Sequence, residues 1–364
     1  MRVAVEMTCL EMDKGGTSRA AMELVSRLEA RDDVDLLQVR HEGNEPSTPV
    51  GRIRRGLQRE LWYFPRTLPR WIEREHPDVI HCPAPITPTR SAAPLVMTLH
   101  DVIALDRPEW MSRRIVRYQR SLLPKMLDRA AHVITSSDYS RSRIVELFDL
   151  APEKITTVPL GIDPRFSPGE VSDEALAAMQ VRRPFILSVG TLQPRKNIVG
   201  AIAGFEAFMA ESGSDHQLVI VGARGWRDDE LLARVAASPQ ADSILIAGRV
   251  SDEQLIDLYR AADVFVFPSR YEGFGFPPLE AMACGTAVVS SDRTSLAEVI
   301  GDVGVTVDPD DAPQIGAAIT QLVASPERRA ELAARGVEHT KTFNWDHTTD
   351  LTLGVYRRAI EQSR

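Results

Sequence analysis

The chain has 364 residues, more than one hydrophobic core usually supports, so we expect two domains. Its 43% hydrophobic and 26% charged residues are typical of a soluble globular protein, and no apolar run is long enough for a membrane span. The net charge of −8 argues against a general nucleic-acid-binding protein, so we expect no nucleic-acid partner.

Strand-like and helix-like segments alternate along the first half of the chain. Short Val/Ile/Leu runs predict strands and longer amphipathic windows predict helices. The predicted strands are residues 3–7, 34–39, 79–82, 95–99, 132–136 and 155–160. The predicted helices are residues 17–30, 56–75, 112–130 and 139–148. Because the strands are apolar without strict alternation, we expect a parallel sheet covered on both faces.

The segment 161–181 interrupts this alternation and contains Pro164, Pro168 and Gly169, which indicates a linker. The alternation then begins again. The second set of predicted strands is 185–189, 218–221, 244–247, 264–268, 287–290 and 305–307. The second set of predicted helices is 197–210, 228–236, 252–262, 279–284 and 313–324, and 326–364 is also helical.

Two successive arrays of this kind predict an α/β protein with two Rossmann-like, doubly wound domains facing each other across a cleft. We expect the domains to span residues 1–163 and 164–345. The C-terminal helix 346–364 either caps the second domain or packs back on the first. Ligands of such sheets bind at the carboxyl ends of the strands, so the cleft is the expected site.

The strongest chemical motif follows the predicted strand that ends at Pro268. Gly273 and Gly275 allow the backbone to approach a ligand closely. The following prolines suit the first turn of a helix, whose N-terminal N–H groups favour a phosphate. Glu272 precedes this helix and Glu280 is expected in its first turn, and carboxylates accept hydrogen bonds from sugar hydroxyls. The alternative is a helix start whose acidic residues only complement the helix dipole.

This segment closely resembles the Glu-x7-Glu motif of retaining glycosyltransferases of the GT-B fold, in the family-four group. The resemblance covers nearly the whole chain and is strongest in residues 185–300. It implies that Glu272 faces the donor sugar and that Glu280 binds the nucleotide ribose. It also implies that the phosphates and sugar are bound by the backbone of Gly273, Phe274, Gly275 and Phe276.

A basic pair lies in the turn after the first predicted strand of the second half. Arg195 and Lys196 could neutralise a departing diphosphate there, which lowers the barrier to breaking a sugar–phosphate bond. The family has a lysine at the position of Lys196. Many members also have an arginine directly after the preceding glycine, where this chain has Thr191, and we expect Arg195 to take that role. The alternative is an ordinary solvated pair.

The first half supplies further candidates. Gly15 and Gly16 open a helix after the first strand, and the family's glycine loop implies that they approach the donor phosphate. His100 ends the strand 95–99, and the resemblance implies that it contacts the donor sugar near the reaction centre. Asp101 is expected to orient this imidazole or to meet the acceptor. Without the family context, a plain turn and a structural histidine would explain these residues.

The loop after the strand 244–247 contains Arg249 and Val250, where family members place the nucleotide base against the backbone. Ser251 and the two acidic residues after it also indicate an ordinary helix start. The sequence Asp308-Pro309-Asp310 matches the Asp-x-Asp metal motif of a different glycosyltransferase fold, but its position before a helix favours an N-cap turn.

We expect neither a metal nor another cofactor. Cys9, Cys82 and Cys284 are widely spaced, which favours a reducing cytoplasm over a disulfide framework. Two basic, aromatic stretches, 52–74 and 107–129, could contact an anionic membrane surface or a lipid-linked acceptor, or could be solvated helix faces. The expected location is therefore the cytoplasm, with peripheral contact at the inner face of the cell membrane.

These features together predict a retaining, metal-independent glycosyltransferase of cell-surface polysaccharide assembly. It would move a hexose, mannose or a related sugar, from a nucleotide-diphosphate donor to a glycan or lipid-linked acceptor. A GDP-sugar donor such as GDP-mannose is favoured, and a UDP-sugar is the alternative. The other functions left open are a sugar-nucleotide epimerase of similar architecture and a non-catalytic nucleotide-sugar binding subunit. A nicotinamide dehydrogenase is disfavoured because no G-x-G-x-x-G follows a strand.

Overall fold

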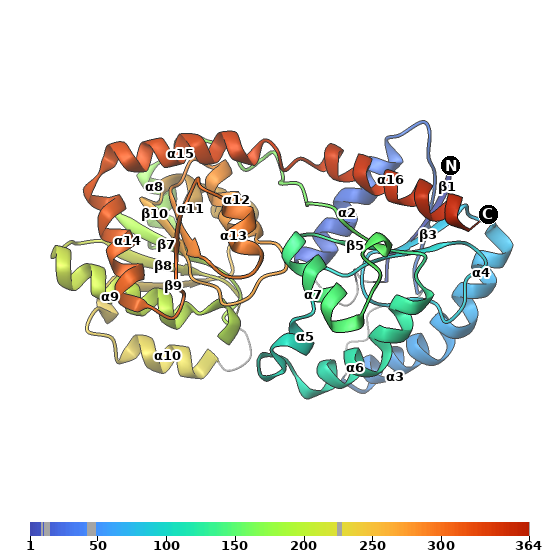
Figure 1. Ribbon diagram of the computed structural model, residues 1–364. Coiled ribbons are helices and arrows are strands. Elements are labelled where there is room, and N and C mark those ends of the chain that lie inside the picture. The colour runs from blue at the N-terminus through green and yellow to red at the C-terminus, as the bar shows by residue number, and fades with distance from the viewer. Residues whose placement is uncertain (9, 11–14, 42–48, 224–227, 364) are drawn as a thin grey trace. The chain divides into compact units, whose positions relative to one another are not determined.

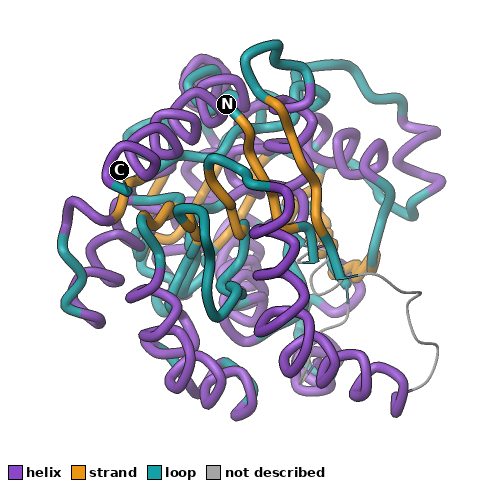
Figure 2. Tube along the Cα trace, turned by 90° about the vertical axis from the view of Figure 1, so that its right-hand side faces the viewer, coloured by secondary structure: helices purple, strands orange, loops and turns teal. Residues whose placement is uncertain are grey.

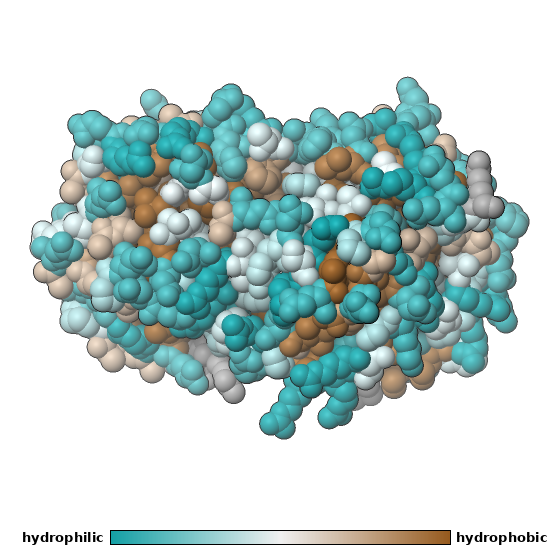
Figure 3. All heavy atoms as spheres, in the orientation of Figure 1, coloured by the Kyte–Doolittle hydropathy of each residue, from teal (hydrophilic) through white to brown (hydrophobic). Residues whose placement is uncertain are grey.

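Two parallel sheets organise the computed structural model, which describes residues 1–8, 10, 15–41, 49–223 and 228–363. The chain divides into two units. The first unit contains Met1–Gly161 and Trp345–Arg364, and the second contains Ile162–Asn344. In each unit, helices cover the strands (Figures 1 and 2). Figure 3 shows that hydrophilic residues cover much of the drawn surface, with apolar residues in separate patches between them.

The first unit has six parallel strands in the order β2-β1-β3-β4-β5-β6. They are β1 (Arg2–Glu6), β2 (Asp35–Val39), β3 (Val79–Cys82), β4 (Leu95–Thr98), β5 (His132–Thr135) and β6 (Ile155–Thr157). The helical segments are α2 (Gly16–Glu29), α3 (Pro49–Gln58), η1 (Arg59–Thr67), α4 (Leu68–Glu75), α5 (Ile103–Asp106), η2 (Pro108–Trp110), α6 (Arg113–Arg129), α7 (Asp138–Phe148), η3 (Pro152–Lys154) and α16 (Trp345–Gln362). The order reverses between β1 and β3, and in doubly wound sheets such a switch point is where ligands bind, at the carboxyl ends of the strands.

The second unit also has six parallel strands, in the order β12-β11-β10-β7-β8-β9. They are β7 (Phe185–Val189), β8 (Gln217–Val221), β9 (Ile244–Gly248), β10 (Val264–Phe267), β11 (Val288–Ser291) and β12 (Val305–Val307). The helical segments are α8 (Asp173–Ala178), η4 (Pro194–Lys196), α9 (Ile198–Ser212), α10 (Asp228–Ala236), η5 (Ala241–Ser243), α11 (Asp252–Ala261), α12 (Phe276–Ala283), α13 (Ser295–Ile300), α14 (Ala312–Ala324) and α15 (Pro326–Thr340). This is the strand order of the classical dinucleotide-binding fold, with its switch point between β7 and β10.

Alternate residues of each buried strand enter two cores, one on each face of the sheet. On β7, Phe185, Leu187 and Val189 pack with α11 and α12, whereas Ile186 packs with α9 and α14. Because both faces are covered, every residue of this strand is buried and all but Ser188 are apolar. The expectation of two doubly wound α/β sheets is therefore confirmed, and the cleft between the two domains stays a prediction.

The C-terminal helix α16 packs on the first unit. Leu353, Val355 and Tyr356 share a core with residues of α2 and β1. The Tyr356 hydroxyl also lies 2.7 Å from Nδ1 of His81 on β3. Residues at the two ends of the chain therefore build one domain core.

Three local expectations were correct only in part. The helix expected over 56–75 is divided into α3, the π-helix η1 and α4, and Pro65 lies inside η1. The expected linker 161–181 contains α8, and Phe166 from this segment is buried in the core of the second unit. The helix expected to begin at Leu279 begins at Phe276, because prolines are tolerated in a first helical turn.

None of the helices in the described part of the chain has both the length and the apolar character needed to cross a bilayer.

Candidate functional site

The switch point of the second unit brings two loops together. Arg195 and Lys196 follow β7, and Glu272 follows β10, the strand that pairs with β7 in parallel. The backbone N–H of Arg270 donates to the carbonyl of Arg195 at 2.8 Å, which fixes one loop on the other. Ser269 Oγ donates to the same carbonyl at 3.1 Å. The topology therefore explains why residues about 76 positions apart meet here.

The carboxylate of Glu272 is the centre of this site. Lys196 Nζ donates to Oε1 at 2.6 Å, and Arg195 Nη1 donates to Oε2 at 3.0 Å. Ser269 Oγ also donates to Oε1, at 2.7 Å. Glu272 and Lys196 are each only 8% exposed, so this ion pair is shielded from water. The sequence left open that Arg195 and Lys196 are an ordinary solvated pair. The structure instead buries Lys196 as the ion-pair partner of Glu272.

The two cations set the protonation state of Glu272. Burial alone would raise the pKa of this carboxyl, but the charges of Arg195 and Lys196 and the hydrogen bonds from Lys196 and Ser269 outweigh burial and lower it to about 2. Glu272 is therefore ionised at neutral pH. A carboxylate with this pKa is a weak base and is unsuited to act as a general acid.

The Lys196 side chain is held in place along its length. Its Nζ lies 4.9 Å from the centre of the Phe267 ring, at the end of β10. A Cβ atom on Gly190 would lie 3.4 Å from Lys196 Cδ, an ordinary van der Waals distance, so the lysine stem runs alongside this glycine. The next residue, Asn197, has a φ of 52° and donates from Nδ2 to the carbonyl of Pro309 at 2.6 Å. The turn that presents Lys196 is thus tied to the loop after β12.

Two residues that the sequence did not single out shape the Glu272 loop. Ser295 Oγ, which is fully buried, donates to the carbonyls of Glu272 and Phe274 at 2.9 and 2.8 Å. Thr294 Oγ1 accepts a hydrogen bond from the N–H of Glu272 at 3.2 Å. Both follow β11, the neighbour of β10, so the sequence signal was two hydroxyl residues after an adjacent strand.

The loop then passes directly into α12. Gly275 has a φ of 128°, and a Cβ atom there would lie 2.8 Å from Leu296, so this position requires glycine. The Phe274 ring makes edge contacts with the rings of Phe276 and Phe343. Because Pro277 and Pro278 lack an N–H, they cannot donate to a phosphate at this helix start. The contacts of the backbone of residues 273–276 with the donor phosphates and sugar stay predictions.

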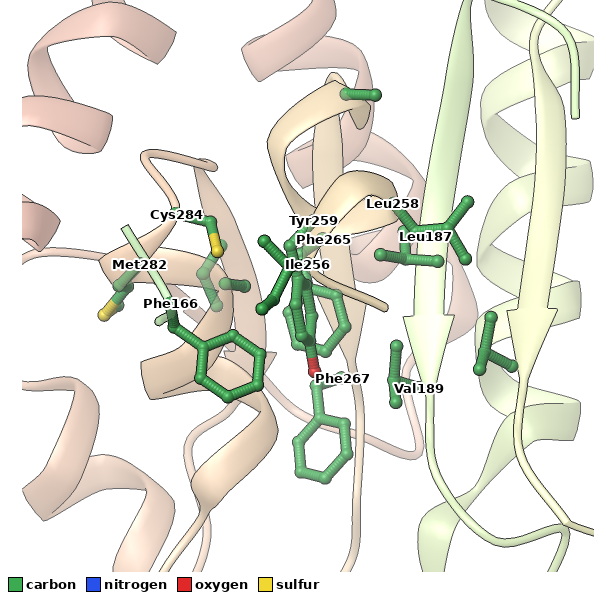
Figure 4. Close-up of a cluster of buried hydrophobic side chains, with 14 of the residues drawn as sticks. Phe166, Leu187, Val189, Ile256, Leu258, Tyr259, Phe265, Phe267, Met282 and Cys284 are labelled. Carbon is green, nitrogen blue, oxygen red and sulfur yellow. The ribbon is translucent and has the colours of Figure 1, made fainter. Parts of the chain in front are cut away.

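Glu280 lies deeper than the sequence predicted. It is the fifth residue of α12 rather than part of the first turn, because the helix begins at Phe276. Its side chain is 4% exposed and accepts a hydrogen bond from the Tyr259 hydroxyl at 3.1 Å. Tyr259 belongs to α11 and lies among Phe265 and Phe267 in the core (Figure 4). Tyr259 therefore fixes one carboxylate oxygen of Glu280.

Arg249 and Val250 follow β9, whose last residue, Gly248, has a φ of 71°. Arg249 is exposed, and Val250 packs partly against the core. Ser251 forms a capping box with Gln254 at the start of α11, so the identity of Ser251 is explained by the helix. The nucleotide-base role of the two preceding residues stays a prediction.

The first-unit candidates lie at the carboxyl ends of β1 and β4. Gly15 is the N-cap of α2 and Gly16 its first residue, both exposed, while Asp13 and Lys14 lie outside the described residues. His100 follows β4 and lines a cavity of about 30 Å³ within this unit, together with His81 and Thr98. The approach of Gly15 and Gly16 to the donor phosphate and the contact of His100 with the donor sugar stay predictions.

Asp101 has a local role in the first unit. Its Oδ1 accepts from the N–H of Ile103 at 3.1 Å, at the start of α5. This hydrogen bond stabilises the helix start. The expected contacts of Asp101 with His100 or the acceptor stay predictions.

The Asp-x-Asp sequence faces arginines. Asp308 Oδ1 accepts from Arg293 at 2.7 Å, and Asp310 accepts from Arg270 at 2.7 Å and from Arg293 at 2.8 Å. The N-cap of α14 is Asp311, one residue beyond the expected turn. Across the residues that the structure describes, no group of three or more His, Cys, Asp or Glu side chains could hold a metal ion.

Two protein families match this chain. The family of glycosyl transferases group 1 matches residues 177–339, and Glycosyltransferase Family 4 matches residues 14–166. The chain is 34% identical to O-antigen chain mannosyltransferase B of Escherichia coli over 366 residues, which cover 94% of this chain and 96% of the relative.

Solved structures resemble the fold over almost its full length. Sucrose-phosphate synthase of Thermosynechococcus elongatus has a TM-score of 0.78 at 22% identity, covering 99% of each chain. HepE of Anabaena, solved in complex with UDP-glucose, has a TM-score of 0.76 at 17% identity, covering 98% of this chain and 99% of HepE. At these identities the likeness shows the fold alone.

Proposed function

This chain belongs to the family-4 glycosyltransferases of the GT-B fold, and we propose that it is a retaining, metal-independent hexosyltransferase. The donor is a nucleotide-diphosphate sugar, and the acceptor is a glycan or a lipid-linked saccharide. The observation that carries this proposal is the buried Glu272 carboxylate held between Lys196 and Arg195 at the switch point of the second unit.

The two cations would stabilise the leaving group. When the bond between the sugar's anomeric carbon and the phosphate oxygen breaks, the electron pair leaves with the diphosphate. Lys196 and Arg195 lie where a nucleotide would bind, and their charge favours this departure. A lysine has three donors and an arginine has five, so both can hold Glu272 and still donate to a phosphate oxygen.

The acceptor's proton would go to the departing diphosphate. The acceptor oxygen attacks the anomeric carbon on the face that the diphosphate leaves, which retains the configuration. Glu272 is poorly suited to accept this proton, because its cationic neighbours hold its pKa at about 2. We assign Glu272 and His100 to the donor sugar, Glu280 to the ribose, and the backbone of residues 273–276 to the phosphates and sugar.

A GDP-linked mannose or related sugar is the donor that we favour. This choice is supported by the 34% identical mannosyltransferase of O-antigen chains, which also supports a role in cell-surface polysaccharide assembly. A UDP-sugar is the alternative, since the HepE structure contains UDP-glucose. We place the reaction in the cytoplasm, at the inner face of the cell membrane, where a lipid-linked acceptor would be presented.

Thermal unfolding with GDP-, UDP- and dTDP-sugars tests the donor. A ligand that binds only the folded state raises the unfolding midpoint, and at a fixed ligand concentration the tighter ligand raises it more. We expect the largest shift with GDP-mannose. A larger shift with a UDP-sugar would assign uracil instead of guanine as the base of the donor. No shift with any of the three would contradict the donor site.

An epimerase or a non-catalytic subunit would give a different outcome. Incubating the wild-type enzyme with GDP-mannose and no acceptor would convert the donor into an epimer if the first alternative held. Binding without transfer to any glycan or lipid-linked acceptor would favour the second.

A further inference from the structure

The most exposed apolar side chains of the described residues lie on one helical segment of the first unit. Leu57, Leu61 and Trp62 are 54%, 56% and 61% exposed. They belong to α3 and η1, and Ile115 of α6 adds a fourth side chain that is 41% exposed. We call these four residues, together with Arg66, Arg113, Arg114 and Arg117, the apolar–basic surface. Figure 1 draws α3 and α6 at the same edge of the first unit.

These side chains cannot turn inward, because the other face of η1 is already in the core. Tyr63 and Phe64 are buried and pack with residues of β1, β3 and α4. The Tyr63 hydroxyl donates to Oε1 of the buried Glu6, at the end of β1, at 3.1 Å. The segment is therefore anchored on the sheet, and the anchor directs Trp62 away from it.

The backbone of this segment is unusual. η1 is a nine-residue π-helix, and π-helical turns are rare and concentrate at functional sites. It places Arg66 beside Trp62, with the guanidinium carbon 4.6 Å from the centre of the indole ring. A tryptophan, leucines and an arginine on one helical face form the side-chain set that lies at a membrane–water interface.

Positive charge is concentrated around these apolar residues. Residues 49–75 carry seven arginines against three acidic residues, and residues 107–129 carry seven basic against two acidic residues, although the whole chain carries −8. On α6 the exposed side chains include Arg113, Arg114 and Arg117. The charges of Glu60 and Arg59 on η1 reach Tyr118 on α6, so the two basic stretches lie within electrostatic range of each other.

We infer that the apolar–basic surface docks on an anionic lipid bilayer. The apolar side chains would enter the boundary between headgroups and acyl chains, and the arginines would pair with the lipid phosphates. A second copy of the chain fits less well, because two copies would bring like charges together. The biological use of this contact rests on the proposed function, since docking would bring the enzyme to a lipid-linked acceptor.

Vesicle binding tests the inference without sugar nucleotide. Full-length protein is sedimented with vesicles of phosphatidylcholine alone or mixed with phosphatidylglycerol, at low and high ionic strength. We expect binding only to the anionic vesicles, weakened by salt because exposed charges are screened. The double variant Leu61→Ser/Trp62→Ser and the double variant Arg113→Glu/Arg117→Glu should each lower the partition coefficient by about tenfold or more.

Matched controls separate docking from folding and catalysis. Met22→Ser and Val199→Ser remove apolar side chains of similar exposure outside this surface and should bind like the wild type. All variants should keep the wild-type unfolding midpoint and the wild-type affinity for the nucleotide sugar.

Failure of the wild type to bind anionic vesicles, or unchanged binding of the Leu61→Ser/Trp62→Ser variant, would overturn the inference. Self-association of the wild type that this variant abolishes would assign the surface to a second copy instead. If the wild type binds anionic vesicles but binds no nucleotide sugar, the result would count against the proposed function alone.

Discussion

Lys196 Nζ lies 2.6 Å from Oε1 of Glu272, and both side chains are buried at the switch point of the second sheet. This ion pair joins the loop after β7 to the loop after β10. Breaking a buried pair leaves an uncompensated charge, which usually costs about 3–5 kcal/mol. Here Arg195 Nη1, at 3.0 Å from Oε2, provides a second cation, so removing either one alone leaves Glu272 partly compensated.

Replacement of Lys196 tests its part in stabilising the leaving group. We expect Lys196→Ala to lower kcat by roughly 10²–10³-fold, because one of the two charges that stabilise the departing diphosphate is lost. The exposed Lys341, which pairs with Glu338 three residues earlier in the chain, supplies the control Lys341→Ala. Steady-state kinetics at saturating substrate concentrations measure kcat for Lys196→Ala and for the control Lys341→Ala. Wild-type turnover in Lys196→Ala would remove this residue from the mechanism.

Acid unfolding should reveal the lowered pKa of Glu272. Because the pKa in the folded protein is about 2, below the usual value of 4.5, the charged carboxylate stabilises the fold above pH 4.5. That stabilisation, about 3 kcal/mol for a shift of this size, is lost as the pH falls from 4.5 through 2.

The variant Glu272→Gln should therefore unfold more easily than the wild type at neutral pH, and the difference should shrink on acidification. Urea unfolding between pH 7 and the acid limit measures it, with the conservative variant Glu327→Gln as an exposed control. A difference that stays constant over the whole pH range would contradict the assigned ionisation.

The role of Glu280 can be separated from its contact with Tyr259. If Glu280 binds the ribose, Glu280→Ala should weaken nucleotide affinity by about tenfold to a hundredfold, since hydrogen bonds to a charged group contribute about 1.5–3 kcal/mol. Tyr259→Phe keeps the carboxylate and removes only the 3.1 Å hydrogen bond, so its effect on affinity should be smaller. Isothermal titration with GDP and UDP compares them. Equal losses in both variants would make Glu280 a structural residue.

Gly275 provides a backbone test of the same loop. Its φ is 128°, and an added Cβ atom would lie 2.8 Å from Leu296, so Gly275→Ala should cost about 1–3 kcal/mol in stability and weaken donor binding. Gly56→Ala in α3 meets no atom within 4 Å and is the control. That helical substitution should be neutral or stabilising by up to about 1 kcal/mol. Chemical denaturation and donor titration together check the pair, and an unaffected Gly275→Ala would show that the loop tolerates a side chain.

The strands were predictable because parallel strands buried on both faces are continuous apolar runs. The second-unit strand expected at 185–189 is β7 (Phe185–Val189) with the same bounds. The short helix α8 was missed because it has six residues and follows a segment rich in proline and glycine. The π-helix η1 was missed because amphipathic periodicity alone does not separate α from π turns.

The candidate site was predictable as residues but not as contacts. Lys196 and Glu272 were each placed in loops at strand ends, yet their contact depends on β10 lying beside β7, and strand order is not written in local periodicity. The same reason hid Ser295, whose hydroxyl reaches two carbonyls of the preceding loop from the end of β11. Glu280 was misplaced by one turn because the helix start depended on how the prolines are accommodated.

The stereochemistry of transfer in the presence of a chelator tests the central claim most directly. The enzyme is supplied with an α-linked sugar nucleotide, acceptor and excess EDTA, and the first-formed product is examined by the anomeric proton signals in NMR. The account predicts undiminished transfer and an α-linked product, because the cations Lys196 and Arg195 stabilise the leaving group and the acceptor attacks on the face that it leaves. A β-linked product, or transfer abolished by the chelator and restored by a divalent metal, would contradict it.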